Sequence, residues 1–177
     1  MKAEGAKIKE MLTRNVEEII GRENLEKKIS SGRQLRIKHG VDATSPLLHL
    51  GHAVNFWKMR EFQELGHKVV FLIGDFTTQI GAPTGRFETR PEISPRQAEK
   101  NARTYLKQAS KILINKPRLL EIRRNSEWYR KLNILDFLKL AKRITHARLI
   151  KRDMFQERLR KSKEIYTPEL LYPIFQG

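Results

Sequence analysis

Apolar residues recur along the chain first at helical and then at strand-like spacing. Those between residues 10 and 20 predict a first helix that ends near Gly21, and residues 24–30 predict a second, shorter helix. A strand is expected over Gln34–Val41, followed by a turn and by a helix that starts at His49. The apolar positions of this third helix, expected to include core residues, are Val54, Phe56, Trp57, Met59 and Phe62.

The second half of the pattern indicates an α/β fold. Val69–Ile73 is an unbroken apolar run typical of a parallel strand buried on both faces, and Gly66 before it is a plausible helix C-cap. Ligands bind beyond the carboxyl ends of such strands, and Asp42 and Asp75 follow the ends of the two expected strands, so both are candidate ligand-binding residues. Further expected elements are a helix over 93–113 that begins at Ser94 and Pro95, a strand over 119–123, mostly helical structure over 134–163 and a helix from Thr167.

Composition narrows the class of partner. The 177 residues contain 36 Lys and Arg against 20 Asp and Glu, and a net charge of +16 makes nucleic acid the natural candidate. The absence of cysteine excludes disulfides and thiolate metal sites. No apolar run approaches a membrane span and Met1–Glu10 lacks a signal core, so we expect a cytoplasmic protein without a membrane partner.

The candidate chemistry gathers in residues 38–52, where a strand end, a short loop and two histidines follow one another. His49 and His52 are three positions apart and share one face of a helix. They lie in its first turn, where unpaired backbone N–H groups and the helix dipole favour an anion such as a triphosphate. Gly51 would let adenine or ribose approach the backbone closely. This pattern predicts nucleotide binding.

The same residues resemble the class I aminoacyl-tRNA synthetases, whose signature is His-x-Gly-His after the first strand. The motifs similar to bacterial-type tyrosyl-tRNA synthetases are, in order, Gly40-x-Asp42-x-Thr44, His49-Leu50-Gly51-His52, Ile80-Gly81-Ala82-Pro83-Thr84-Gly85-Arg86, Glu88-Thr89-Arg90-Pro91, and Tyr172 with Gln176. The resemblance runs from about Val16 to the last residue and covers the first half of that family's catalytic domain. It implies a Rossmann-like parallel-sheet domain, with an N-terminal helical segment over 1–33, the first half of the nucleotide-binding domain over 34–132, and a helical insertion with the start of a tyrosine-binding helix over 133–177.

The resemblance also implies a reaction and the residues that carry it. The family is a tyrosine–tRNA ligase, which uses ATP, bound with Mg²⁺, to activate tyrosine to tyrosyl-AMP and then transfers it to tRNA(Tyr); no metal ligands are expected in the chain itself. The residues expected to act on ATP in the transition state are Thr44, His49, His52, Arg86 and Arg90. Those expected to bind ATP are Gly40, Asp42, His49, Gly51 and His52. Those expected to bind tyrosine are Lys38, Asp42, Thr77, Asn125, Tyr172 and Gln176.

Several residues depart from the family pattern, among them Ala43 in place of the usual Pro after Asp42, and the following departures bear on tyrosine binding. Ala82 replaces an Asp whose carboxylate pairs with the substrate ammonium, a loss of roughly 1.5–3 kcal/mol that weakens tyrosine binding by about tenfold to a hundredfold. Lys38 stands where many members have a tyrosine that meets the substrate hydroxyl. The chain stops at Gly177, one residue before a Tyr-Asp pair whose Asp reads that hydroxyl, so the 177 residues alone are expected to be inactive.

The helical segment after residue 133 combines basic and apolar residues. Its cations either contact the acceptor arm of tRNA or form a solvated helix face, and the sequence favours neither alternative. These cations are Lys139, Lys142, Arg143, Arg148, Lys151, Arg152, Arg158, Arg160, Lys161 and Lys163. Its apolar residues exceed what one helical hairpin needs and predict a homodimer; they are Ile134, Phe137, Leu138, Ile144, Leu149, Ile150, Met154 and Phe155.

Two other interpretations stay open from the sequence. A non-catalytic, truncated paralogue that binds tRNA or dimerises would fit the short length and Ala82. A small adenylyltransferase could use the same histidine pair, but it would not explain Arg86, Arg90 and Tyr172. Outside the motifs, His39, His67 and His146 are expected to be structural or exposed.

Overall fold

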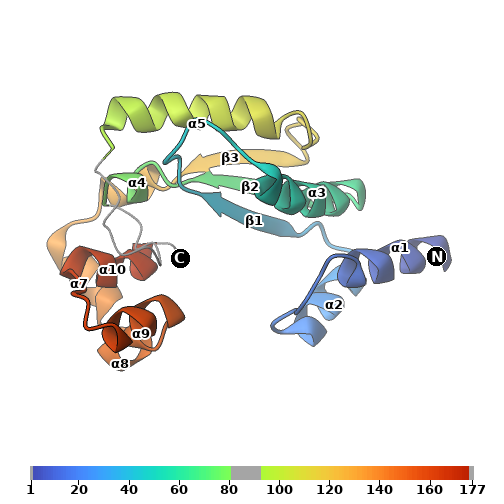
Figure 1. Ribbon diagram of the computed structural model, residues 1–177. Coiled ribbons are helices and arrows are strands. Elements are labelled where there is room, and N and C mark those ends of the chain that lie inside the picture. Colours follow the sequence, from blue (N-terminus) through green and yellow to red (C-terminus); the bar gives the residue numbers. More distant parts are fainter. Residues whose placement is uncertain (1, 81–92, 176–177) are drawn as a thin grey trace. The chain divides into compact units, whose positions relative to one another are not determined.

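A three-stranded parallel sheet organises the fold. The computed structural model describes residues 2–80 and 93–175, and Figure 1 shows the strands in the order β1 (Arg36–Val41), β2 (Lys68–Ile73), β3 (Leu120–Arg124). Backbone hydrogen bonds tie the strand ends together: the Gly74 N–H donates to the Val41 carbonyl at 2.8 Å, and the Asn125 N–H donates to the Ile73 carbonyl at 3.0 Å. The predicted α/β class and all three predicted strands are confirmed.

The chain forms two compact units, and the boundaries between them fall within the three strands. The first unit comprises Met1–His39, Leu48–Phe71 and Lys107–Glu121, and the second comprises Gly40–Leu47, Leu72–Leu106 and Ile122–Gly177. The segment boundaries expected from the sequence, 1–33, 34–132 and 133–177, stay a prediction. Within the described residues, no helix is both long and apolar enough to cross a membrane.

The first unit packs three helices around one apolar cluster. They are α1 (Lys2–Thr13), α2 (Arg22–Ser30) and α3 (Leu50–Glu64), and their shared core contains Met11, Leu12, Ile29 and Phe62. At the end of α3, the Gly66 N–H donates to the Gln63 carbonyl at 2.9 Å and the His67 N–H donates to the Phe62 carbonyl at 3.0 Å. This is a Schellman motif, and Gly66 has the left-handed φ of +85° that such a motif requires. The predicted C-cap is therefore confirmed.

The prediction of a first helix over 10–20 was wrong. The helix α1 ends at Thr13, whose hydroxyl donates back to the Lys9 carbonyl at 2.9 Å, and Asn15 then takes a left-handed φ of 54°. Asn tolerates this conformation better than most residues, so the turn stops the helix despite the apolar residues beyond it. Ile20, expected on the helix, is 92% exposed.

The placement of Trp57 in the core was also wrong. Phe56 and Phe62 are buried as expected, whereas Trp57 is 57% exposed. Successive residues of a helix lie about 100° apart around its axis, so burial of the Phe56 face turns Trp57 outward. The apolar periodicity of the sequence is compatible with burial of either Phe56 or Trp57, so it does not determine which of the two faces the core.

The second unit contains mostly short helices. They are α4 (Thr77–Ile80), α5 (Pro95–Ala109), α6 (Ser126–Tyr129), α7 (Ile134–Ala141), α8 (His146–Ile150), α9 (Asp153–Arg160) and α10 (Thr167–Phe175). The last turn of α5, from Lys107 on, belongs to the first unit. Ser94 caps α5 as expected, with its hydroxyl accepting from the Gln97 N–H at 3.3 Å, but the helix ends four residues before the predicted Leu113. The helical stretch after residue 133 is confirmed as three helices, two of them capped by Asn133 and Thr145.

The packing of α9 against α10 corrects two expectations. The Arg158 guanidinium is buried and contacts both Glu169 carboxylate oxygens at 2.9 Å, with side-chain exposures of 8% on each partner, so Arg158 does not belong to a basic RNA-facing surface. Leu149 and Phe155 are buried within the unit and cannot contribute to a dimer interface. The error for Arg158 arises because its partner cannot be identified from the sequence: Glu169 lies eleven positions beyond it.

Candidate active site

The second unit holds a polar cluster centred on the Asp42 carboxylate, directly after β1. The Thr77 hydroxyl donates to Asp42 Oδ1 at 2.7 Å, and the Tyr172 hydroxyl of α10 donates to Asp42 Oδ2. Gly74 lies beneath them, and a Cβ at this position would overlap the Asp42 carboxylate and the Thr77 hydroxyl. Only glycine fits there, because no side chain could be added without displacing the carboxylate.

Asn125 supports this cluster from the end of β3. Its Oδ1 accepts from the Phe76 N–H at 2.9 Å, and its Nδ2 donates to the Thr77 hydroxyl at 2.9 Å. Thr77 therefore accepts from Asn125 and donates to Asp42, so one directed line of hydrogen bonds ends on the carboxylate. Asn125 and Thr77 are buried, and we expect their mutual bonds to fix the Thr77 rotamer.

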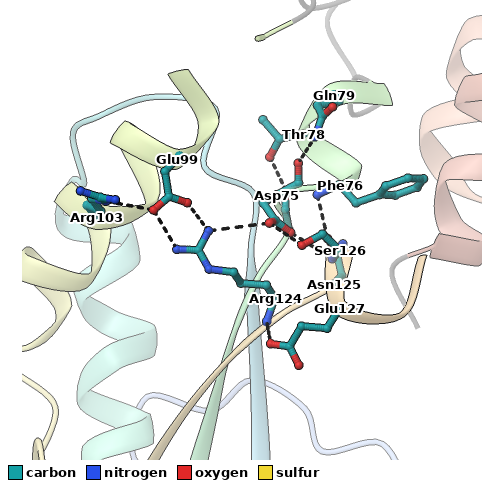
Figure 2. Close-up of polar contacts among 11 residues, drawn as sticks. Asp75, Phe76, Thr78, Gln79, Glu99, Arg103, Arg124, Asn125, Ser126 and Glu127 are labelled. Atoms are coloured by element: carbon teal, nitrogen blue, oxygen red, sulfur yellow. Dashed lines mark hydrogen bonds and ion pairs between the residues drawn. The ribbon is translucent and has the colours of Figure 1, made fainter. Parts of the chain in front are cut away.

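Asp75 holds the adjoining loop in place. Its carboxylate accepts from the Ser126 N–H at 3.0 Å and from the Ser126 hydroxyl at 2.6 Å, and the Arg124 guanidinium lies 3.7 Å away. Figure 2 draws these contacts. Phe76 is tied to Asn125 directly beside this pair. Two consecutive residues of the loop after β2 are thus bonded to two consecutive residues after β3, which fixes the backbone that carries Thr77.

Aromatic rings position α10, and with it Tyr172. Phe175 lies between three rings, stacked on Phe137 with centroids 5.3 Å apart, edge-on to Tyr129 at 5.1 Å, and 5.7 Å from Phe76. The Tyr129 hydroxyl also donates to the Phe175 carbonyl at 2.8 Å. Because Phe76 precedes Thr77 in the chain, the same contacts join α10 to the loop that supports Asp42.

The first unit holds the second candidate feature, the histidine pair at the start of α3. His49 is the N-cap residue, and its Nδ1 accepts from the Gly51 N–H at 3.2 Å. The His49 N–H in turn donates to His52 Nδ1 at 3.3 Å, and the two ring centroids are 4.1 Å apart. A Cβ on Gly51 would lie 3.0 Å from the His49 ring, so this glycine makes room for the imidazole.

The hydrogen bonds at Nδ1 set the tautomer of both rings. Burial lowers the pKa of His52, and the neighbouring His49 lowers it further. Because both Nδ1 atoms accept hydrogen bonds, the neutral tautomer carries its proton on Nε2. Each ring therefore has an N–H donor on the side away from the helix backbone, which suits an anionic oxygen.

The remaining histidines have structural or surface positions, as expected. His39 packs edge-on against Phe56 at 5.5 Å and lies 5.9 Å from Phe71, while His67 Nδ1 accepts from the Leu35 N–H at 3.3 Å. Burial lowers the pKa of both. His146 is exposed. Among the residues that the structure describes, no group of three His, Asp or Glu side chains is arranged to hold a metal ion.

The structure places the predicted residues unevenly. It brings Asp42, Thr77, Asn125 and Tyr172 together, and it pairs His49 with His52. Thr44 is half-buried, with its N–H bonded to the Asp42 carbonyl at 2.8 Å, whereas Lys38 and Gly40 are exposed on β1. The predicted residues that lie outside the described ranges are Arg86, Arg90 and Gln176, together with the departure at Ala82.

Several supporting residues were missed by sequence reasoning. Asn101 is fully buried in α5, and its Nδ2 donates to the Ala43 carbonyl at 2.8 Å, which anchors the loop after Asp42. A signal existed, because this Asn falls on the otherwise apolar seam of α5 that includes Ala98 and Ala102. Gly74 and Ser126 gave no such signal, since their roles depend on partners from distant segments.

Comparison with known proteins places these features in a family. A family model described as class I tRNA synthetases (W and Y) matches residues 30–177. The tyrosine–tRNA ligase of Oleidesulfovibrio alaskensis is 51% identical over 166 residues, which cover 94% of this chain and 41% of that protein. The corresponding ligase of Deinococcus radiodurans is 49% identical over 168 residues, with 95% and 41% covered. The chain thus spans about two fifths of the length of these relatives.

Solved structures agree on the fold. A C-terminally truncated mitochondrial tyrosyl-tRNA synthetase from Aspergillus nidulans matches 99% of this chain and 56% of its own with a TM-score of 0.74 and 21% identity. A tyrosyl-tRNA synthetase from Archaeoglobus fulgidus, complexed with L-tyrosine, matches 98% of this chain and 50% of its own with a TM-score of 0.72 and 21% identity. These likenesses confirm the predicted Rossmann-like architecture.

Proposed function

Because this chain belongs to the class I tRNA synthetases of the tryptophan and tyrosine group, we propose that it supplies the amino-terminal part of a tyrosine–tRNA ligase. A tyrosine carboxylate oxygen attacks the α-phosphorus of ATP, the bond from that phosphorus to the bridging oxygen breaks, and pyrophosphate leaves. A ribose hydroxyl of tRNA(Tyr) then attacks the carbonyl carbon of tyrosyl-AMP and releases AMP. The observation that carries the proposal is the Asp42 cluster with Thr77, Asn125 and Tyr172.

The Asp42 cluster is the proposed tyrosine site. Tyr172, with Gln176, would hold the α-amino group of the substrate, and Asp42 would line the pocket beside Gly40. Thr77 and Asn125 fix the Asp42 carboxylate through the bonds described above, so they are positioning residues. Lys38 would replace the usual tyrosine near the substrate hydroxyl. This arrangement supports an amino acid ligand because a half-buried carboxylate and a phenol hydroxyl lie together.

The histidine pair is the proposed ATP site. Each Nε2–H would donate to a phosphate oxygen as negative charge develops there, a form of stabilisation that a preorganised donor supplies without reorganisation. Thr44, Arg86 and Arg90 would add a hydroxyl and two guanidinium forks, which match phosphate geometry. ATP would enter as its Mg²⁺ complex.

The outer face of α7 is the proposed homodimer contact. Three of its apolar side chains are exposed, Ile134 at 78%, Leu135 at 69% and Leu138 at 55%. Such a patch is costly in water, and covering it with the same face of a second copy would form a two-fold interface. Sedimentation equilibrium should give a dimer for the wild type and a monomer for Leu135→Glu; equal masses would contradict this contact.

Tyrosine binding by the 177-residue chain tests the proposed site directly. We expect equilibrium dialysis to show saturable binding of radiolabelled tyrosine, weakened tenfold or more by Asp42→Asn. Asp136→Asn is the matched control, because the Asp136 carboxylate pairs with the exposed Lys139 at 3.0 Å and lies outside the Asp42 cluster. Equal tyrosine binding by the wild type and Asp42→Asn would contradict the assignment.

A further inference from the structure

Helix α5 carries a row of cations opposite its buried face. Ala98, Ala102 and Tyr105 are buried, whereas Arg96, Lys100 and Arg103 are exposed. The three cations follow i, i+4, i+7 spacing, so they fall within about 60° of the helix circumference and extend over about 10 Å. Lys107 in the last turn of α5 continues the series. We call Arg96, Lys100 and Arg103 the α5 ridge.

The single acidic residue of α5 does not neutralise this ridge. Glu99 lies beside it and accepts from Arg103 at 2.9 Å, but it also accepts from Arg124 of β3 at 3.2 Å (Figure 2). The hydrogen bond from Arg124, and then that from Arg103, lower the pKa of Glu99, which therefore stays charged. Within α5, Glu99 is therefore one carboxylate against the three cations of the ridge, which keeps a net positive charge.

The ridge cations also line an open hollow on this side of α5. Its lining is Ser94, Arg96, Gln97, Glu99, Lys100 and Arg103, and its volume is about 550 Å³. All six of these residues have polar or charged side chains. A lipid surface would need apolar side chains between the cations, which this face lacks, whereas a chain of phosphates needs only cations and hydrogen-bond donors.

We propose that the α5 ridge binds the phosphate backbone of RNA, at a surface additional to the basic helical segment over 139–163. Guanidinium forks match phosphate oxygens, and Lys100 adds a compact charge between them. A net charge of +16 brings an RNA polyanion to the chain at long range, and the ridge then holds its backbone without reading its sequence. The inference requires no ligase activity, so it can fail or hold independently of the proposed function.

The salt dependence of RNA binding tests the ridge. We would measure fluorescence anisotropy of a labelled tRNA transcript with the full 177-residue chain, from 50 to 300 mM KCl. The ridge variant is Arg96→Gln/Lys100→Gln/Arg103→Gln, and the control is Lys27→Gln/Lys28→Gln/Arg33→Gln, which removes as many exposed charges from the other unit. We expect the ridge variant to lose about two to three units of the slope of log K against log salt, and the control to lose less than about one.

Two further arms make the result decisive. Arg96→Gln/Lys100→Gln leaves the Arg103–Glu99 pair intact and should lose about two units of slope, which guards against misfolding of the triple variant. Vesicles containing phosphatidylserine should bind the wild type and the ridge variant equally. Equal slopes for the ridge and control variants would overturn the proposal, as would a loss of vesicle binding as large as the loss of tRNA binding.

Discussion

The Tyr172 hydroxyl donates a hydrogen bond to the Asp42 carboxylate across 130 positions of sequence. Asp42 follows the first strand, and Tyr172 lies in the last helix that the structure describes. The contact closes the second unit over its polar cluster, and Phe175 fixes the helix end from which Tyr172 reaches the carboxylate.

Removing that hydroxyl should weaken both folding and tyrosine binding. Tyr172→Phe keeps the buried ring but deletes a donor to a carboxylate, so we expect a loss of about 1–3 kcal/mol of unfolding free energy and at least tenfold weaker tyrosine binding. Tyr166→Phe is the control, because Tyr166 is exposed and its hydroxyl donates to Glu164 at 3.1 Å, away from the Asp42 cluster. Urea unfolding and equilibrium dialysis measure the two effects. Unchanged tyrosine binding by Tyr172→Phe would remove Tyr172 from the site.

The Asp75–Ser126 contact should matter through the loop that it holds. Ser126→Ala deletes the donor at 2.6 Å from a buried carboxylate and should lower the unfolding free energy by about 1–3 kcal/mol. Ser110→Ala, which removes an exposed hydroxyl bonded to the Lys107 carbonyl, should change it by less than about 0.5 kcal/mol. If both variants unfold at the same urea concentration, the network of Figure 2 does not stabilise the second unit.

The buried Arg158–Glu169 pair should show strong coupling. Removing one partner leaves an uncompensated buried charge, so Arg158→Met and Glu169→Met should each cost about 3–5 kcal/mol. The double variant should cost less than either single change, because two apolar side chains of similar size replace the pair. Additive losses in a double-mutant cycle would show that the two side chains do not interact.

Stability should also fall on mild acidification. Burial, and then the charge of His52, lower the pKa of His39, and burial lowers that of His67. The unfolded chain binds protons more readily, so the stability is complete above the ordinary histidine pKa of about 6.5 and is lost as pH falls toward the folded-state values. His39→Leu should reduce the loss between pH 7.5 and 5.5 in urea unfolding, while the exposed His146→Gln should keep it. A wild type whose stability rises on acidification would contradict this sign.

Local chemistry made part of this structure predictable. The C-cap at Gly66, the cap at Ser94 and the buried strand from Val69 each depend on a few neighbouring residues, and each was confirmed. The need for glycine at Gly74 depends on Asp42 and Thr77, which meet only in the folded chain. Arg158 lies in a run of basic residues that reads as a solvent-exposed face, and nothing in that run indicates its pairing with Glu169. Contacts between distant segments could therefore be predicted only where a family resemblance placed both residues in one site, as it did for Asp42 and Tyr172.

Tyrosine-dependent exchange of pyrophosphate into ATP tests the central claim most directly. The Oleidesulfovibrio alaskensis ligase is 51% identical to this chain over 166 residues. We would join residues 1–177 to the part of that ligase that follows the matched region, and assay the natural ligase in parallel. The hybrid should catalyse exchange that requires tyrosine, and His49→Ala/His52→Ala should lower the rate about a hundredfold or more, whereas His146→Ala should not. Exchange that is absent from the folded hybrid, or that survives loss of both histidines, would contradict the assignment of this chain to tyrosine activation.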